Sequence, residues 1–147
     1  MDLTTGEIAC ADLTKDDVGD PSALPELLEQ IDAPFSRFLA DGAYDGDPTS
    51  DLLMNRFGEN VEIIIPPPRN AIPNPASDHD PTSRDKSIAT IRDNGRMAWK
   101  VSSGYNQRSW GETQMGRWKT VIGPKLKARN FQNQKQRFGL AQAFSTK

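Results

Sequence analysis

Apolar residues in the first 65 positions follow strand-like and helix-like spacing in turn, and the order of these patterns restricts the fold. Three segments predict strands: residues 7–14, 35–41 and 61–65. Between them, Asp-Pro pairs at Asp20 and Asp47 each predict a helix start, with the aspartate as N-cap and the proline at the first helical position. The order strand, helix, strand, helix, strand favours an α/β fold in which right-handed crossovers join parallel strands.

The rest of the chain changes character. A proline-rich segment without periodicity predicts a long loop, and from Ser83 onward the spacing is helical again, with a last helix expected from about residue 130. At 147 residues the chain has the length of one domain. We interpret it as a single domain in three parts, a strand and helix part, the loop and a basic helical part: residues 1–65, 66–82 and 83–147.

The net charge of −2 hides a strong asymmetry between the two halves of the chain. Residues 1–62 hold fifteen acids and three bases, a formal charge of −12, whereas residues 63–147 hold fifteen bases and five acids, a formal charge of +10. Such asymmetry indicates an anionic partner for the basic half, with nucleic acid as the first candidate. The alternative is that the two halves neutralise each other within one fold, because sequence alone does not say where side chains point.

Composition also excludes some broad classes of protein. No apolar run approaches the ~20 residues that a membrane helix needs, so we expect no membrane-spanning segment. Cys10 is the only cysteine, which excludes an internal disulfide and any multi-cysteine metal site. The N-terminal sequence lacks the pattern of a signal peptide, and we therefore expect a cytoplasmic protein.

The second expected strand ends in the sequence DGAYD, which begins at Asp41. A carboxylate at the C-terminal end of a sheet strand lies at the rim where α/β folds place their functional sites. Gly42, next to it, allows a backbone segment or a ligand to approach closely. Asp41 is therefore a candidate site residue, although such an acid on its own is more often a turn former or a helix cap.

Four polar residues share one face of a helix expected over residues 105–122: Tyr105, Arg108, Glu112 and Lys119. Their spacing places them within an arc of about 60° on that helix. Arg108 and Glu112 also have the spacing of an ordinary surface ion pair, which is the alternative interpretation. Against it, Glu112 is the only acid among eleven Lys and Arg residues in the segment 94–147, and this indicates a role in metal chemistry.

Together these residues resemble a known family. The pattern Tyr105-x2-Arg108-x3-Glu112-x6-Lys119 matches the Tyr-Arg-Glu-Lys signature of the DDE transposases of bacterial insertion sequences. The stretches FLADGAYD, RDKSIATIRDNGRMAWK and YNQRSWGETQMGRWKTVIG are similar to the group named after insertion sequence five. The resemblance covers essentially the whole chain.

The resemblance implies an RNase H-like catalytic domain of the α/β class, in which three carboxylates hold two divalent cations, Mg²⁺ or Mn²⁺. Asp41 would be the second of these carboxylates and Glu112 the third, and they would serve in-line phosphoryl transfer during DNA transposition. Tyr105, Arg108 and Lys119 would contact transposon-end DNA. The implied partner is double-stranded DNA, with two copies of the chain assembled on it at the nucleoid.

The chain departs from the family pattern at its start. In the family the first catalytic aspartate lies on the first strand of the sheet, ahead of a hairpin, whereas MDLTTGEI resembles the turn between the second and third strands. We therefore expect an incomplete domain without the first strand or strands, with Asp2 in the turn and only as an alternative candidate for the first acid. An active transposase fragment and a catalytically inactive DNA-binding remnant both agree with this interpretation.

Tryptophan and histidine give weaker signals in the basic half. Trp99, Trp110 and Trp118 are typical of core packing, and stacking on an exposed base is the alternative, with Trp110 as its best candidate because it lies between Arg108 and Glu112. His79 is expected to be a solvated loop residue.

Overall fold

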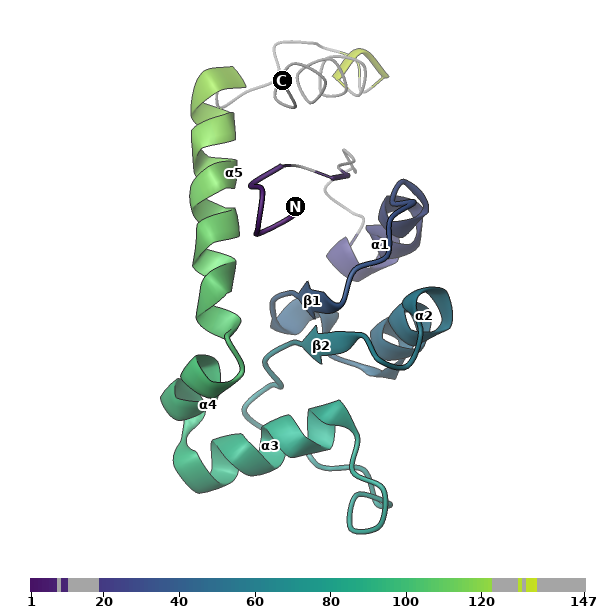
Figure 1. The fold of residues 1–147 in the computed structure, drawn as a ribbon, viewed down its shortest axis with the longest axis vertical. Coiled ribbons are helices and arrows are strands. Elements are labelled where there is room, and N and C mark those ends of the chain that lie inside the picture. The colour runs from purple at the N-terminus through teal and green to yellow at the C-terminus, as the bar shows by residue number, and fades with distance from the viewer. Residues whose placement is uncertain (8, 11–18, 123–129, 131, 135–147) are drawn as a thin grey trace. The chain divides into compact units, whose positions relative to one another are not determined.

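A computed structural model describes residues 1–7, 9–10, 19–122, 130 and 132–134 of the chain (Figure 1). The contacts within it divide the chain into two compact units. The terminal unit comprises Met1–Ala33 and Gln107–Lys147, and the central unit comprises Pro34–Asn106. Each unit contributes its own helices, and the described β-sheet belongs to the central unit.

The central unit begins with a strand, a helix and a strand that follow one another in the sequence: β1 (Arg37–Leu39), α2 (Asp47–Phe57) and β2 (Glu62–Ile64). The two strands are parallel, with Arg37 opposite Glu62 and Leu39 opposite Ile64. Parallel pairing requires a crossover connection, and α2 supplies it. The strands predicted over 35–41 and 61–65 are therefore confirmed, in shorter form, and their arrangement agrees with the expected α/β class.

The predicted helix caps differ from the observed ones by one residue. Asp20 and Asp47 are each the first residue of their helix, α1 (Asp20–Glu29) and α2, and the N-cap positions belong to Gly19 and Gly46. Both N-caps are glycines, so neither helix start has a side-chain cap hydrogen bond. For Asp47 the physical reason is that an aspartate in the first turn already stabilises a helix through its charge near the positive end of the helix dipole.

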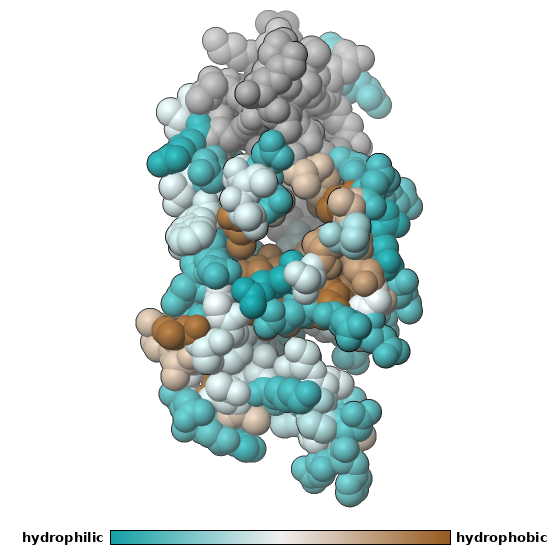
Figure 2. Space-filling view, viewed as in Figure 1, coloured by the Kyte–Doolittle hydropathy of each residue, from teal (hydrophilic) through white to brown (hydrophobic). Residues whose placement is uncertain are grey.

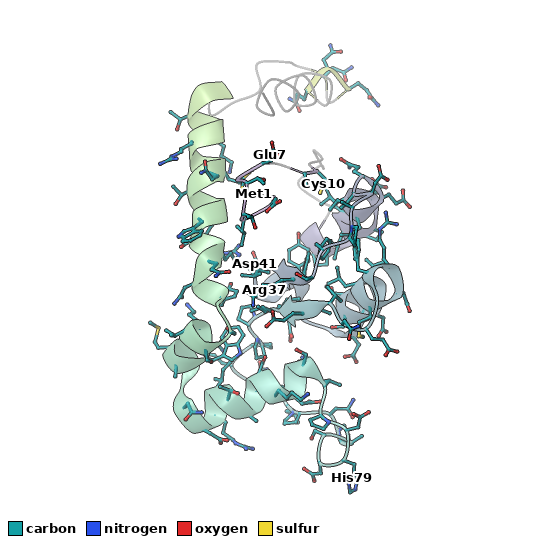
Figure 3. The ribbon with its side chains drawn as sticks, viewed as in Figure 1. Met1, Glu7, Cys10, Arg37, Asp41 and His79 are labelled. Carbon is teal, nitrogen blue, oxygen red and sulfur yellow. The ribbon has the colours of Figure 1, made fainter. Side chains whose placement is uncertain are left out.

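Residues 66–82 contain no helix or strand, as the sequence predicts, and His79 lies exposed at the far end of this loop (Figure 3). The loop leads into α3 (Ser83–Asn94), and Gly95, at a φ of +85°, separates α3 from α4 (Arg96–Ser102). Positive φ favours glycine because a side chain would be strained there. The sequence anticipated this weak point but not that it would end one helix and start another.

The core of the central unit draws on α2, β2, α3, α4 and residues next to the two strands. Its buried apolar side chains include Ala40, Leu53, Val61, Ile64, Ile65, Pro67, Ile88 and Trp99. Trp99 is only 2% exposed, so the prediction of core packing is confirmed for this tryptophan. The surface in the view of Figure 2 is predominantly hydrophilic, with apolar areas separated from one another.

The terminal unit contains α1 and α5 (Arg108–Ile122), and α1 buries Leu24 and Leu28. Its N-terminal residues form a turn in which the Asp2 amide donates to the Glu7 carbonyl and the Gly6 amide donates to the Asp2 carbonyl, both at 2.9 Å. A turn is therefore present where the sequence predicts one, but no strand flanks it at the described residues 1–7, 9 and 10. Within the described part of the chain, no helix is long and apolar enough to cross a membrane.

Several sequence predictions fall partly or wholly outside the described residues. The strand expected over 7–14 is absent at Glu7, Ala9 and Cys10, and the remaining positions of that segment are not described. The helix stop expected at Gly123-Pro124 is not described either. Of the helix expected from about residue 130, residues 130 and 132–134 are described, and 132–134 are helical.

Candidate metal-binding and DNA-contacting residues

Asp41 lies at the C-terminal end of the parallel strand pair (Figure 3). The ladder extends one residue past β1, because the Ala40 amide donates to the Ile64 carbonyl at 3.3 Å. Asp41 follows directly and caps the 3-10 turn η1 (Gly42–Tyr44), with its Oδ1 accepting from the Ala43 amide at 2.9 Å. The predicted position of this carboxylate at the strand end is thus confirmed.

Gly42 allows the segments that follow the two strands to meet. A Cβ atom built on Gly42 would lie 3.1 Å from the backbone oxygen of Pro66, closer than side-chain carbons normally approach an oxygen. The close approach predicted at this glycine therefore involves the backbone just after β2. This close approach lies next to Asp41, at the edge where both strands end.

The far end of η1 is fastened by a contact that the sequence did not predict. Asp45 is the C-cap of this turn, and its carboxylate accepts from Nε of Arg84 at 3.0 and 3.1 Å and from Nη2 at 3.0 Å. The Asp45 side chain is only 8% exposed, and the pair raises the pKa of Arg84 above its ordinary value. Both ends of the Asp41 turn are therefore held, one by the sheet and one by α3.

Arg108, Glu112 and Lys119 lie on α5 at spacings of four and seven, so one face of this helix presents all three. Arg108 and Glu112 form the surface ion pair that was the alternative interpretation of their spacing, and the Glu112 side chain is 60% exposed. An exposed pair at this spacing contributes only about 0.3–0.5 kcal/mol to stability. Breaking this one contact would therefore cost little.

Tyr105 does not share that regular helix. It starts the 3-10 turn η2 (Tyr105–Gln107), and the α-helix begins only at Arg108. The prediction of one helix over 105–122 is wrong in its first turn, because Gly104, with a φ of +73°, still belongs to the preceding connection. Tyr105 instead lies against Trp99 of α4, with ring centroids 5.4 Å apart.

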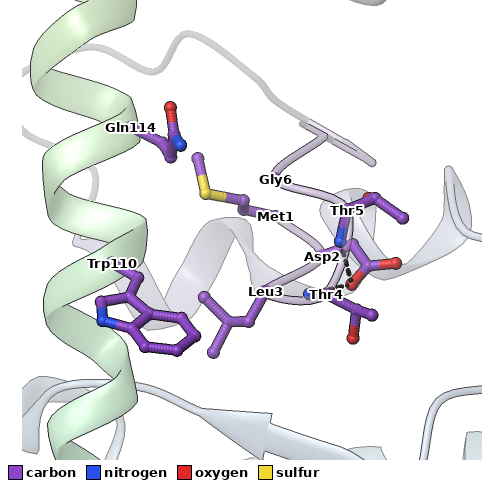
Figure 4. Close-up of a pocket in the computed structure, with 8 residues that line it drawn as sticks. All are labelled: Met1, Asp2, Leu3, Thr4, Thr5, Gly6, Trp110 and Gln114. Atoms are coloured by element: carbon purple, nitrogen blue, oxygen red, sulfur yellow. Dashed lines mark hydrogen bonds between the residues drawn. The ribbon is translucent and has the colours of Figure 1, made fainter.

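Asp2 is engaged by its own turn, as the sequence predicts. Its Oδ1 accepts from the amides of Thr4 at 2.7 Å and Thr5 at 3.4 Å, and the Thr4 hydrogen bond is the main cause that lowers the pKa of Asp2 (Figure 4). The turn faces α5 across a cavity of about 270 Å³, which Trp110 and Gln114 line from the helix. Trp110 is 63% exposed, so core packing is wrong for this residue.

The donor chemistry of Asp41 and Glu112 fits a hard divalent cation, because carboxylate oxygens are the ligands that Mg²⁺ and Mn²⁺ prefer. The two carboxylates come from different units, Asp41 from the central unit and Glu112 from the terminal unit. Among the residues that the structure describes, no three His, Cys, Asp or Glu side chains gather into a metal-holding group.

Comparison with known proteins identifies the family. The chain matches the family model described as the transposase DDE domain over residues 1–145. No solved structure matches the chain. The domain has an RNase H-like α/β fold, with which the parallel β1–β2 pair and its helical crossover agree. Since the match spans nearly the whole sequence, the chain belongs to the family of DDE-domain transposases.

Proposed function

We propose that this chain acts in DNA transposition by metal-dependent phosphoryl transfer on transposon ends, as a member of the group named after insertion sequence five. The family supports a transposase function. The position of Asp41 is the main support for assigning this function to particular residues. Its carboxylate lies where two parallel strands end, and Arg84 holds the turn that follows it.

In this proposal Asp41 and Glu112 hold Mg²⁺ or Mn²⁺. When bound, such a cation stabilises the charge on the transferred phosphoryl group and lowers the pKa of an attacking water or 3′-hydroxyl. The protein's part is to hold the two carboxylates in place, Asp41 at the fixed end of η1 and Glu112 on α5.

The same proposal assigns DNA contacts to Tyr105, Arg108 and Lys119. Arginine and lysine side chains and a phenol hydroxyl are the groups that proteins commonly direct at phosphate oxygens. The Arg108–Glu112 pair lies at the surface, so its loss to a phosphate contact would cost little. We further propose that two copies of the chain assemble on double-stranded DNA at the nucleoid.

The test is a cleavage and strand-transfer assay on duplex DNA that carries the inverted repeats flanking the coding sequence. We expect products only with Mg²⁺ or Mn²⁺, and loss of at least ~10³-fold in rate for Asp41→Asn and for Glu112→Gln. Asp51→Asn, which removes an exposed acid of α2, is the matched control and should keep full activity.

Two results would count against the proposal. Full activity in Glu112→Gln would remove this residue from the metal site. Duplex binding by the wild-type chain without any metal-dependent product would support the alternative, a catalytically inactive DNA-binding remnant.

A further inference from the structure

We propose that Lys100 is a further phosphate-contacting residue, and that Ser103 and Trp99 are positioning residues that hold Tyr105 beside it. The inference rests on the proposed DNA-binding function and deepens it. Lys100, Ser103 and Trp99 all lie outside the Tyr-Arg-Glu-Lys pattern, and all belong to the central unit together with Tyr105.

Trp99 provides a fixed base for the Tyr105 ring. Its indole is 2% exposed, and it meets the phenol ring at a centroid distance of 5.4 Å and an interplanar angle of 36°. Aromatic pairs at such distances are favourable beyond their buried area. The buried ring therefore limits the directions in which the Tyr105 side chain can lie.

The backbone of Tyr105 is fastened to α4 through one hydroxyl group. The Ser103 Oγ donates to the Trp99 carbonyl at 2.7 Å and accepts from the Tyr105 amide at 3.4 Å. Gly104 makes the turn between them at a φ of +73°, a conformation that favours glycine. Side chain and backbone of Tyr105 are thus both held by the end of α4.

Lys100 brings a positive charge to the same ring. Its Nζ lies 5.8 Å from the Tyr105 ring centroid, within the range of a cation–π contact. The sequence between Asp93 and Glu112 contains no acid that would neutralise this charge locally. A single phosphate has several acceptor oxygens, so it can accept from the phenol hydroxyl and from the ammonium group together.

The experiment measures binding of the full chain to a mixed-sequence DNA duplex by fluorescence anisotropy over a range of NaCl concentrations. We expect Lys100→Met to reduce the slope of log K against log [NaCl] by about 0.9, the value for one phosphate contact, and to weaken binding roughly eightfold at ~0.1 M salt. Lys100→Arg keeps the charge and should keep the slope.

Arg56→Met is the matched control for this experiment. Arg56 also carries a cation over an aromatic ring, 5.6 Å from the Phe57 centroid, but it belongs to α2 in the acidic half of the chain. Its substitution removes the same charge and the same kind of contact, and should leave the salt slope unchanged. An equal loss of slope in both variants would show a general charge effect and overturn the assignment to Lys100.

The positioning role of Ser103 has its own readout. Ser103→Ala should weaken duplex binding without a change of salt slope, and Ser103→Thr should keep the affinity of the wild type. In a Tyr105→Phe background, Ser103→Ala should no longer weaken binding. A loss of affinity that is the same in both backgrounds would contradict this role. Circular dichroism and thermal unfolding of each variant check that the fold is kept.

The outcomes separate this inference from the proposed function. If Arg108→Met and Lys119→Met reduce the salt slope while Lys100→Met does not, the inference about Lys100 is wrong and the proposed DNA contacts stand. If the wild-type chain does not bind the duplex, or binds it without salt dependence, both are wrong.

Discussion

Asp85 shows how one buried acid can organise a helix start. Its carboxylate accepts from the Thr82 hydroxyl at 2.7 Å and from the amides of Thr82 at 3.0 Å and Asn74 at 2.8 Å. The Thr82 hydroxyl is the largest cause that lowers the pKa of Asp85, and Arg84 adds to it. The charged form therefore stabilises the folded state.

The lowered pKa of Asp85 sets the direction of a pH effect. Its contribution to stability is complete above the ordinary aspartate pKa of ~3.9 and is lost as the pH falls through the lowered value. Asp85→Asn should cost about 1–2 kcal/mol near pH 7 and flatten the acid dependence, measured by urea unfolding from pH 7 to pH 3. Asp78→Asn, an exposed acid of the loop, is the control. An unchanged acid dependence in Asp85→Asn would contradict this account.

Two glycines predict opposite effects of the same substitution. Gly42→Ala places a methyl group 3.1 Å from the Pro66 oxygen, a backbone atom that cannot move aside cheaply, and should destabilise the fold by about 1–3 kcal/mol. Gly116→Ala on α5 meets nothing within 4 Å and should stabilise by up to about 1 kcal/mol, because alanine is the better helix former. Thermal unfolding measures both. A Gly42→Ala variant as stable as the wild type, or more stable, would refute the close approach at Gly42.

At the scale of elements, side chains of α3 and α4 hold the proline-rich loop at three places. Arg84 donates to the Ile72 carbonyl at 3.2 Å, Asp85 accepts from Asn74, and Arg96 donates to the Pro67 carbonyl at 2.8 Å. Arg84 also holds Asp45, so one side chain connects the loop, α3 and the turn that carries Asp41. Hydrogen bonds with α3 and α4 thus hold the loop of residues 66–82 in one conformation in this structure.

Substitution of Arg84 tests its contacts with Asp45 and with the Ile72 carbonyl together. Arg84→Met should destabilise the chain by about 1–3 kcal/mol, since it leaves the largely buried Asp45 carboxylate without its cation. Arg84→Lys should recover only part of this, because a lysine lacks the forked geometry of the guanidinium group. Urea unfolding gives the energies, and limited proteolysis should cut residues 66–82 faster in Arg84→Met. Equal proteolysis rates would contradict the fastening of the loop.

The order of elements was predictable from the sequence, but their contacts were not. Strand and helix spacing identified β1, α2 and β2, and Gly104 marked the break before the last described long helix, whereas Gly95 indicated only a weak point. The Arg84–Asp45 pair joins residues 39 positions apart, and nothing in local spacing indicates such a contact. The Thr82 and Asp85 capping box was visible in principle, as a threonine followed three residues later by an acid.

At the scale of the whole molecule, the opposite charges of the two halves are used in more than one way. Arg84 and Asp45 pair across the halves, whereas Arg108 and Glu112 pair within the basic half. In the described part of the chain, the acidic and basic halves therefore neutralise each other at the Arg84–Asp45 pair, which is a local contact. The large excess of Lys and Arg after residue 93 agrees with the proposed use of this half on DNA.

The proposed function requires that Asp41 and Glu112 share divalent cations. The most direct measurement is a crystal structure of the chain with duplex DNA and Mn²⁺, in which anomalous scattering locates the metal. We expect an anomalous peak bound by both carboxylates, and the carboxylates should lie within ~4–8 Å of each other because paired catalytic metals sit ~3.5–4 Å apart. An ordered structure in which the two carboxylates are more than ~12 Å apart and bind no common ion would contradict it.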